Sequence, residues 1–322
     1  MVRRKSPKDL TDGCRYVLSA GGKRIRSTLV LLSCEAVGGT AEQALDAGAS
    51  VEIMHNFTLV HDDIMDNADS RRGRPTVHRR WNVNNALLIG DVLLGLAYRN
   101  LLNTRSALIG SIVDVFTTGL LEVCEGQALD LEFGRRSDVL LPEYFRMIEK
   151  KTARLLSMAA EIGALIGNAK DRQTEALRRY GHFLGRAFQL QDDLLDVVAD
   201  QRNFGKSIGG DIIEGKKTFL LLKAAERARG KDKTVLESIL RRDDPGINTL
   251  VRRRSGHKVS DPQKRTIATV TRIYKRYGVI EEVQDLIRQN TRKATAALAM
   301  LPQSNAKGML HWLSELLVDR VS

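Results

Sequence analysis

At residues 59–66 the sequence reads Leu-Val-His-Asp-Asp-Ile-Met-Asp, an apolar run that ends in three carboxylates. In an α-helix, residues four apart lie about 5.4 Å apart on one face, so Asp62 and Asp66 would be stacked, with Asp63 on the neighbouring stripe. Stacked acids repel each other unless a cation neutralises them, and aspartate oxygens are ligands that Mg²⁺ accepts. The stretch therefore predicts the end of a largely buried helix that can bind a divalent metal ion.

The same pattern returns at residues 188–196, Phe-Gln-Leu-Gln-Asp-Asp-Leu-Leu-Asp, which contain Asp192, Asp193 and Asp196. A single acid pair at this spacing is common on a solvated helix face. Two copies, each closing an apolar segment, instead predict a paired metal site. A basic, glycine-containing segment follows each copy, at residues 70–75 and 203–218.

Composition favours helices. The chain has 322 residues, only six prolines and 5% aromatic residues, with long stretches rich in Ala, Leu, Arg and Glu. No alternation of strands and helices appears. We predict an all-α protein, a single-domain bundle of long antiparallel helices around a central cavity, over residues 1–322.

The formal net charge of +12 suggests polyanionic partners such as phosphates. Basic residues are dispersed in short clusters and form no stripe interleaved with aromatic residues, so we expect no nucleic-acid binding. Cys14, Cys34 and Cys124 are odd in number and widely spaced, which indicates free thiols in a reducing compartment. No long uncharged apolar run or signal-peptide core is present, and we expect a cytoplasmic protein without membrane insertion.

Apolar periodicity and helix-stop residues give the expected elements. Helices are predicted over residues 7–20, from Lys23 to Gly38, 41–68, from about Trp81, 101–133, 143–169, 174–198, 263–277, 281–301 and 305–318. Residues 241–262 are expected to form a loop between helices.

Two acid clusters with basic turns predict a site that holds metal ions in the middle and phosphate oxygens around them. Metal ions that bridge a diphosphate make it a good leaving group, so such a site would assist ionisation of a carbon–oxygen bond. The basic segment 203–218 lacks the spacing of a P-loop, but its glycines and lysines suit a lid over phosphate.

These residues resemble the trans-isoprenyl diphosphate synthases, the polyprenyl synthetase family. The resemblance spans nearly the whole chain. It rests on an ordered set of motifs: Gly21-Gly22-Lys23-Arg24-Ile25-Arg26, Asp62-Asp63-Ile64-Met65-Asp66, Arg71-Arg72-Gly73-Arg74-Pro75-Thr76-Val77-His78, Lys151-Thr152, Gln189, Asp192-Asp193-Leu194-Leu195-Asp196, Gly205-Lys206, Asp211 and Lys216.

The resemblance implies a condensation in which an allylic diphosphate ionises, the alkene of isopentenyl diphosphate attacks C1, and a proton is lost to pyrophosphate. It implies up to three Mg²⁺ ions, for which Mn²⁺ can substitute, and a homodimer. Asp62, Asp66 and Asp192 are expected to bind Mg²⁺, with Asp63, Asp193 and Asp196 as further or water-mediated ligands. The allylic diphosphate is expected to be bound by Arg71, Lys151, Lys206 and Lys216. Isopentenyl diphosphate is expected to be bound by Lys23, Arg26, His55 and Arg72. Polar atoms directed at the developing cation are expected from Thr152 and Gln189.

Product length is expected to depend on the residues below the first acid triad. Phe57 lies five residues before Asp62, and the small Thr58 lies four before it. In the family an aromatic residue at the fifth position resembles a stop for C20 chains, so we predict geranylgeranyl diphosphate. If Phe57 is ordinary core, farnesyl or longer products remain open.

The sequence differs from the family pattern in two places, and two other functions were weighed against it on the same motifs. Family members usually have an additional helix before the Gly-Gly-Lys-Arg stretch, whereas twenty residues precede it here, so we expect the usual first helix to be missing. Ser27 stands where a proline often follows. A class I terpene cyclase shares only one aspartate-rich motif, and a non-catalytic partner subunit would normally lack one triad; both triads are present.

Overall fold

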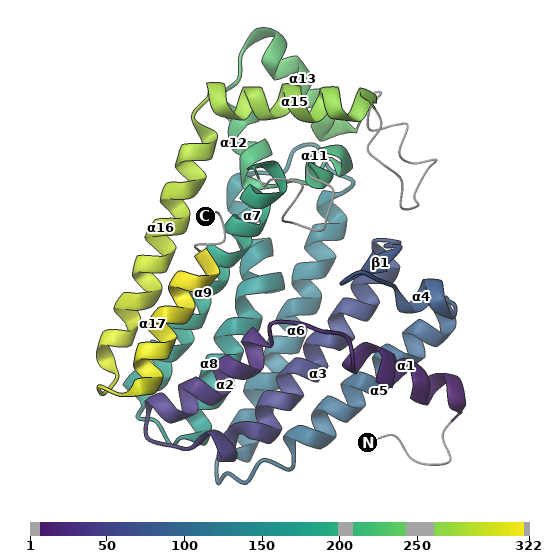
Figure 1. Ribbon diagram of the computed structural model, residues 1–322. Helices are drawn as coiled ribbons and strands as arrows, with labels where there is room; N and C mark the ends of the chain where they lie inside the picture. Colours follow the sequence, from purple (N-terminus) through teal and green to yellow (C-terminus); the bar gives the residue numbers. More distant parts are fainter. Residues whose placement is uncertain (1–6, 199–208, 243–260, 319–322) are drawn as a thin grey trace. The chain divides into compact units, whose positions relative to one another are not determined.

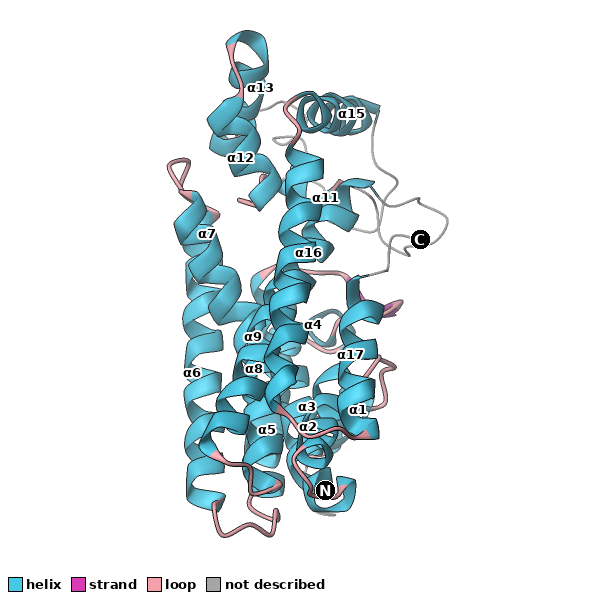
Figure 2. Cartoon of the chain, turned by 90° about the vertical axis from the view of Figure 1, so that its left-hand side faces the viewer, coloured by secondary structure: helices cyan, strands magenta, loops and turns pink. Residues whose placement is uncertain are grey.

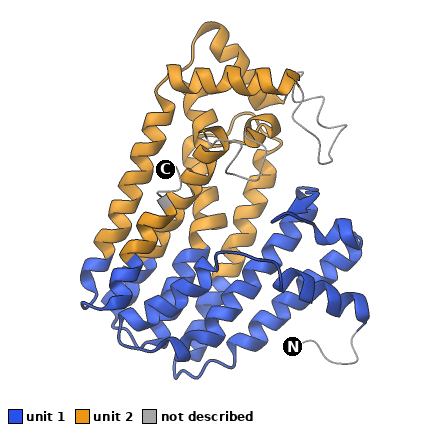
Figure 3. Cartoon of the chain, viewed as in Figure 1, with its two compact units in different colours: residues 1–118, 155–178, 298–310 blue, residues 119–154, 179–297, 311–322 orange. Residues whose placement is uncertain are grey.

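The computed structural model describes residues 7–198, 209–242 and 261–318, and its regular structure is almost entirely helical (Figures 1 and 2). This confirms the predicted all-α class. The chain divides into two compact units made of interleaved segments (Figure 3). Unit 1 comprises residues 1–118, 155–178 and 298–310, and unit 2 the remainder. The expectation of a single domain stays a prediction.

The helices of unit 1 pack around the long helix α3. Gly48 of α3 comes so close to α2 that an added Cβ would lie 2.7 Å from Leu31 Cδ1. On another side α3 packs against α5, where a Cβ on Gly90 would lie 2.2 Å from His61 Nε2. The elements before α6 are α1 (Lys8–Leu18), α2 (Ile25–Ala36), α3 (Ala41–Met65), α4 (Val77–Arg80) and α5 (Val83–Leu101).

A β-hairpin follows α3. Strand β1 (Ser70–Arg71) pairs antiparallel with β2 (Arg74–Pro75), with Ser70 opposite Pro75. The two residues between them, Arg72 and Gly73, have φ angles of 53° and 73°. Positive φ at both central positions is the geometry of a tight hairpin turn, and glycine adopts it without strain. The segment predicted as a basic turn is therefore a hairpin that presents arginine side chains.

The core of unit 2 is formed by helices that precede and follow the second acid triad in the sequence. Buried side chains from α7, α9, α12, α15 and α16 form one cluster that includes Tyr144, Leu190, Leu194 and Phe219. The elements are α7 (Leu141–Ile148), a π-helical turn (Glu149–Ala153), α11 (Gly210–Glu214), α12 (Phe219–Arg227), α13 (Gly230–Arg241), α15 (Asp261–Arg276) and α16 (Val279–Ala297). The helices α6 (Ile109–Phe133), α8 (Arg154–Ile166), α9 (Asp171–Val198) and α17 (Asn305–Val318) contribute residues to both units.

Two predicted helix boundaries are wrong. Residues 102–108 are not helical, so α6 begins at Ile109 and not at Leu101; Ser106 Oγ accepts a hydrogen bond from Leu108 N in this connection. Such local side-chain bonds compete with helix formation. The predicted helix over 143–169 is interrupted by the π-helical turn and ends at Ile166.

The other predicted helices lie close to their expected positions. The helix expected from Trp81 begins at Val83 instead, because Asn82 caps it by accepting a hydrogen bond from Asn85 N at 2.8 Å. Most of the predicted loop over 241–262 lies outside the described residues. None of the described helices combines the length and the apolar character that crossing a membrane requires.

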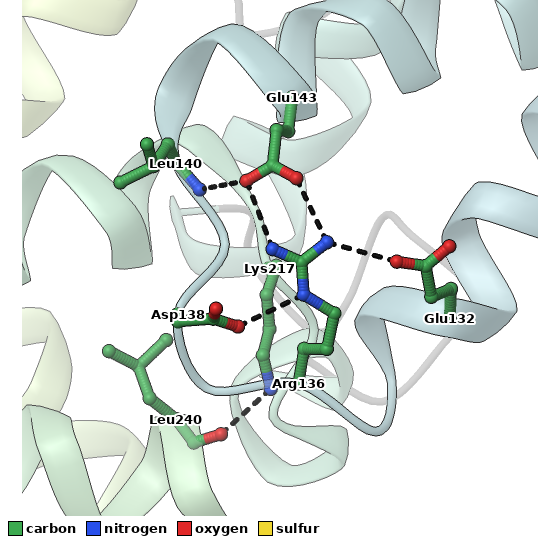
Figure 4. A network of polar contacts seen from close by, with 7 residues as sticks. All are labelled: Glu132, Arg136, Asp138, Leu140, Glu143, Lys217 and Leu240. Atoms are coloured by element: carbon green, nitrogen blue, oxygen red, sulfur yellow. Dashed lines mark hydrogen bonds and ion pairs between the residues drawn. The ribbon is translucent and has the colours of Figure 1, made fainter.

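A polar network joins the end of α6 to the start of α7 (Figure 4). The guanidinium of Arg136 donates to Glu132, Asp138 and Glu143, each at 2.9 Å. Glu143 also accepts from the backbone N–H of Leu140, which caps α7. Arg136 is partly exposed and water screens its ion pairs, so the network fixes the path of this connection more than it adds stability.

The π-helical turn lies beside two close helix contacts. A Cβ on Gly126 of α6 would lie 2.3 Å from Lys151 N, and one on Gly185 of α9 would lie 2.4 Å from Ala153 Cα. These distances leave no room for a methyl group against rigid backbone. A π-helical turn changes the direction in which the following side chains point. Gly126 and Gly185 allow α6 and α9 to pack closely against this turn, which contains Lys151 and Thr152.

Gly126→Ala is expected to destabilise the protein by about 1–3 kcal/mol, because the added methyl must displace the backbone of the π-turn. Gly110→Ala on the same helix meets no atom of the described residues within 4 Å and should change stability by less than about 1 kcal/mol, in the stabilising direction. Urea denaturation of the two variants measures the difference. Equal stabilities would contradict the close packing at Gly126.

Candidate active site

The first acid triad lies at the carboxyl end of α3. Asp62 and Asp63 belong to its last turn, and Asp66 follows its final residue. Asp62 is half-buried and Asp66 exposed, whereas Asp63 is buried and pairs with Arg71, whose Nε lies 2.7 Å from Asp63 Oδ1. The carboxyl end of a helix carries partial negative charge, so these acids require positive partners. Arg71 from the hairpin supplies one of them.

The hairpin turn also brings the arginine motif to the Gly-Gly-Lys-Arg stretch. A Cβ on Gly22 would lie 3.0 Å from Nη1 of Arg72. Arg24 has a left-handed backbone, with φ of 51°, and directly precedes α2. Arg26 lies in the first turn of α2, where backbone N–H groups point away from the helix without helical partners. Two motifs distant in sequence therefore form one basic surface at a helix amino terminus.

His55 lies within this basic cluster. Burial lowers its pKa well below the usual 6.5, and the charges of Arg26, Arg72, Arg71 and Arg24 lower it further. Its Nδ1 is buried and has no hydrogen-bond partner in the described part of the chain. The imidazole is therefore neutral at pH 7. Among the described residues, the sequence-predicted set Arg26, His55 and Arg72 is brought together, while Lys23 is an exposed side chain beside it.

The sequence reasoning did not assign a role to Arg24 and Glu52. Arg24 Nη1 donates to Glu52 Oε1 at 3.0 Å, and Glu52 is 8% exposed. Glu52 partly balances the cluster, since its charge raises the pKa of Arg72 while burial, Arg24 and Arg71 lower it. A signal was present: an acid within the otherwise apolar buried run of α3 indicates a buried ion pair.

The second acid triad lies at the carboxyl end of α9, in unit 2. Asp192 is half-buried, whereas Asp193 is buried and accepts hydrogen bonds on both oxygens, from Tyr144 Oη at 2.7 Å and from Gln189 Nε2 at 2.8 Å. Burial, followed by the charge of Asp211, raises the pKa of Asp193. Tyr144 had no signal in the sequence, because buried aromatic residues are ordinary core components.

The π-helical turn connects to this triad through Gln189. Thr152 Oγ1 donates to Gln189 Oε1 at 2.7 Å, and Gln189 in turn donates to Asp193. Lys151, the residue before Thr152, forms an ion pair with Asp130 of α6 at 2.5 Å. The predicted residues Lys151, Thr152 and Gln189 are thus assembled with the second triad within one unit.

The basic segment after the second triad also contacts it. Asp196 Oδ2 accepts from the backbone N–H of Asp211 at 2.9 Å, and Lys216 Nζ lies 3.2 Å from Asp211 Oδ1. Burial and the charge of Asp211 raise the pKa of Asp196. Lys206, also predicted to bind phosphate, lies outside the described residues. The pattern seen at Asp63 and Arg71 recurs: a carboxylate of the triad is joined to the turn that follows it.

Buried Lys217, next to Lys216, holds this segment in place. Its Nζ donates to the carbonyl oxygen of Leu240 at 2.8 Å (Figure 4) and to that of Gly215 at 3.1 Å. Burial lowers the pKa of Lys217 to about 8. The carbonyl of Leu240 belongs to the last turn of α13, which favours a cation. Lys217 therefore secures the backbone from which Lys216 extends.

The acidic side chains at the two triads determine how a metal ion could be bound. No three acidic, histidine or cysteine side chains among the described residues form a group that could hold a metal ion by themselves. Mg²⁺ usually takes one or two carboxylates and completes its octahedron with water and substrate phosphate. Asp62, Asp66 and Asp192, which are not fully buried, fit that mode of binding and not an all-protein cage.

Comparison with known proteins assigns the family. The model of the family described as polyprenyl synthetase matches residues 7–252. The chain belongs to the polyprenyl synthetase family. The predicted resemblance and the prediction of a prenyltransferase are confirmed.

Relatives of this chain extend over almost its whole length. It is 38% identical over 316 residues to a short chain isoprenyl diphosphate synthase of Methanothermobacter thermautotrophicus, covering 98% of this chain and 91% of that protein. It is 36% identical to a geranylgeranyl diphosphate synthase of Saccharolobus solfataricus, covering 97% and 91%. It is also 35% identical to a geranylfarnesyl diphosphate synthase of Natronomonas pharaonis, covering 98% and 91%.

Solved structures show the same fold. A geranylgeranyl pyrophosphate synthetase from Pyrococcus horikoshii Ot3 superposes with a TM-score of 0.89 at 37% identity, covering 99% of this chain and 92% of that one. A polyprenyl synthase from Caulobacter crescentus CB15, complexed with calcium and isoprenyl diphosphate, gives a TM-score of 0.84 at 28% identity, covering 99% and 91%. The predicted isoprenoid synthase fold is confirmed.

The buried neutral His55 should make folding sensitive to acid. Its folded pKa lies below the unfolded value, so its contribution to stability is present above pH 6.5 and is lost as the pH falls below 6.5. Between pH 7.5 and 5.5, we expect the wild type to lose about 1 kcal/mol more stability than His55→Gln. Urea denaturation at both pH values measures this. His311→Gln is the control and should follow the wild type; equal losses in wild type and His55→Gln would contradict a neutral His55.

Proposed function

We propose that this chain is a Mg²⁺-dependent prenyltransferase that condenses isopentenyl diphosphate with C5 to C15 allylic diphosphates to geranylgeranyl diphosphate. One observation carries the proposal: each acid triad is joined to a basic segment, Asp63 to Arg71 and Asp196 through Asp211 to Lys216. Acids beside cations in this arrangement suit a metal-bound diphosphate, whose negative charge the cations and the metal ions would share. The family assignment and the geranylgeranyl diphosphate synthases among the relatives support the same reaction.

Asp62, Asp66 and Asp192 would hold Mg²⁺, with Asp196 acting through water. When bound, the ions neutralise the diphosphate and make it a better leaving group. Asp63 has an oxygen engaged by Arg71, and Asp193 has both oxygens engaged, so we assign them as supports for their triads. This division follows the exposure of the carboxylates, because a ligand oxygen must be accessible to the ion.

The cationic side chains divide between the two substrates. Arg71, Lys151, Lys206 and Lys216 would hold the allylic diphosphate. Lys23, Arg26, His55 and Arg72 would hold isopentenyl diphosphate at the amino terminus of α2, where free N–H groups and the helix dipole favour an anion. The neutral His55 can donate a hydrogen bond to a phosphate oxygen without adding charge to an already basic cluster.

The reaction balances between the two substrates and needs no oxidant or reductant. The bond between C1 and oxygen of the allylic diphosphate breaks, and pyrophosphate leaves with the electron pair. The alkene of isopentenyl diphosphate forms a bond to C1, and the resulting cation loses a proton to the released pyrophosphate. Thr152 and Gln189 would direct oxygen atoms at the developing cation.

The chain exposes apolar side chains that fit the expected homodimer. Val83, Leu87 and Leu88 of α5 are 47%, 42% and 56% exposed. Large aliphatic groups on one helix face are typical of a surface covered by another protein chain. A second copy of this chain is the partner that the family implies.

A cytoplasmic location is part of the proposal. Cys14 and Cys34 are free thiols, and burial raises their pKa to about 11, which keeps them unreactive. Free thiols suit a reducing compartment.

The decisive assay supplies Mg²⁺, isopentenyl diphosphate and each of the C5, C10 and C15 allylic diphosphates, followed by chain-length analysis. We expect geranylgeranyl diphosphate, and a fall in kcat of roughly 100-fold or more in Asp62→Asn and Asp192→Asn. Asp171→Asn, at the exposed start of α9, is the control and should stay within about twofold of the wild type.

Consumption of allylic diphosphate without isopentenyl diphosphate would indicate a cyclase. Activity only with a homologous partner would indicate a regulatory subunit.

Phe57 is proposed to limit product length. Its side chain is buried and its ring contacts His61 edge-on at 4.8 Å between centroids, while Thr58 Oγ1 donates to the backbone of its own helix.

Phe57→Ala is expected to shift the main product from C20 to C25 or longer, because it removes a bulky side chain one and a half turns before Asp62. Radiolabelled product analysis measures the shift. Val51→Ala, also buried in α3 but further from the triad, is the control and should keep the C20 product; unchanged products in Phe57→Ala would rule Phe57 out as the stop.

A further inference from the structure

Tyr144 ends a chain of hydrogen bonds that begins at Thr152. Thr152 Oγ1 donates to Gln189 Oε1, Gln189 Nε2 donates to Asp193 Oδ1, and Tyr144 Oη donates to Asp193 Oδ2, all within 2.8 Å. Tyr144 is 1% exposed and Asp193 is 5% exposed. These four residues come from α7, the π-helical turn and α9, and all of them belong to unit 2.

The two oxygens of Asp193 accept from different residues. The Tyr144 hydroxyl donates to Oδ2, so Oδ1 is the oxygen that faces the Gln189 amide. Gln189 must then turn its NH₂ group to Asp193 and its carbonyl oxygen to Thr152.

An amide can take either orientation when its neighbours can both donate and accept. Thr152 is such a neighbour, because a hydroxyl can do both, and it therefore cannot select the orientation of Gln189. Asp193 can select it, because the oxygen that faces Gln189 only accepts. The orientation decides whether the electron-rich or the electron-poor end of the amide lies on the Thr152 side.

We propose that Tyr144 is a positioning residue that, through Asp193, fixes the Gln189 side chain with its carbonyl oxygen toward Thr152. The inference rests on the proposed function, in which Thr152 and Gln189 direct oxygen atoms at a carbocation. Tyr144 touches neither substrate nor metal in this role.

The primary test is Tyr144→Phe, which removes one hydroxyl from a closely packed ring. We expect kcat to fall roughly tenfold, the equivalent of about one hydrogen bond to a charged group, with the KM of both diphosphates and the Mg²⁺ half-saturation unchanged. Tyr180→Phe is the matched control: its hydroxyl, equally buried in unit 2, accepts from Ser314 Oγ at 3.1 Å, and its loss should leave kcat unchanged.

A double-mutant cycle distinguishes positioning from a general loss of stability. If Tyr144 acts through Gln189, Tyr144→Phe combined with Gln189→Met should be no slower than Gln189→Met alone. Additive losses would overturn the inference. The inference would also be overturned if the wild type makes prenyl diphosphate and Tyr144→Phe keeps its full kcat.

Asp193→Asn keeps the size of the side chain but replaces a carboxylate with an amide that both donates and accepts. Because the Tyr144 hydroxyl can also donate or accept, the atom that faces Gln189 is no longer restricted to accepting, and the orientation of the Gln189 amide is no longer fixed. We expect a larger fall in kcat than in Tyr144→Phe, again with unchanged Mg²⁺ half-saturation. A large increase in the Mg²⁺ requirement would show that Asp193 is a metal ligand and would overturn its positioning role.

A readout without turnover separates this inference from the proposed function. In protein labelled with ¹⁵N-glutamine, the side-chain NH₂ signal of Gln189 is identified by its loss in Gln189→Met. It should show slow hydrogen exchange in the wild type and fast exchange in Tyr144→Phe. If exchange is slow in the wild type and fast in Tyr144→Phe but the protein makes no prenyl diphosphate, the proposed reaction is rejected and the proposed orientation of Gln189 stands. If the Gln189 NH₂ group exchanges at the same rate in both proteins, the proposed orientation is rejected.

Discussion

Carboxylates at the carboxyl end of a helix meet the negative end of the helix dipole, and both acid triads of this protein stand there. Neither triad could persist in a folded protein without positive or hydrogen-bonding partners. The structure supplies them locally: Arg71 pairs with Asp63, and Tyr144 and Gln189 donate to Asp193. The other acids of each triad, Asp62, Asp66, Asp192 and Asp196, are more accessible than these two buried ones.

Each unit meets this constraint with a different device. In unit 1 a tight hairpin turns the chain back so that Arg71 reaches Asp63 and Arg72 reaches the turn before α2. In unit 2 a π-helical turn, packed against glycines of two helices, places Thr152 next to Gln189. Irregular backbone is thus concentrated where charged groups must be presented, while long regular helices provide the rigid frame.

The basic cluster around His55 carries an electrostatic cost in the folded protein. Arginines near a buried neutral histidine repel one another, and Glu52 compensates only part of this charge. Under the proposed function, a bound anion would relieve this repulsion and the relief would contribute to the affinity for diphosphate.

The sequence by itself determined the helical class, most helix boundaries, the two acid triads and the family, because helical periodicity and short motifs are local properties of the chain. It also predicted Arg71, Lys151, Thr152 and Gln189 as site residues. Only the tertiary structure decided that Asp63 and Asp193 are buried and hydrogen-bonded while Asp66 is exposed, and that Arg24, Glu52 and Tyr144 adjoin these sites. Residues of one motif have the same charge and spacing in the sequence, and their exposure and partners depend on which distant segments pack against them.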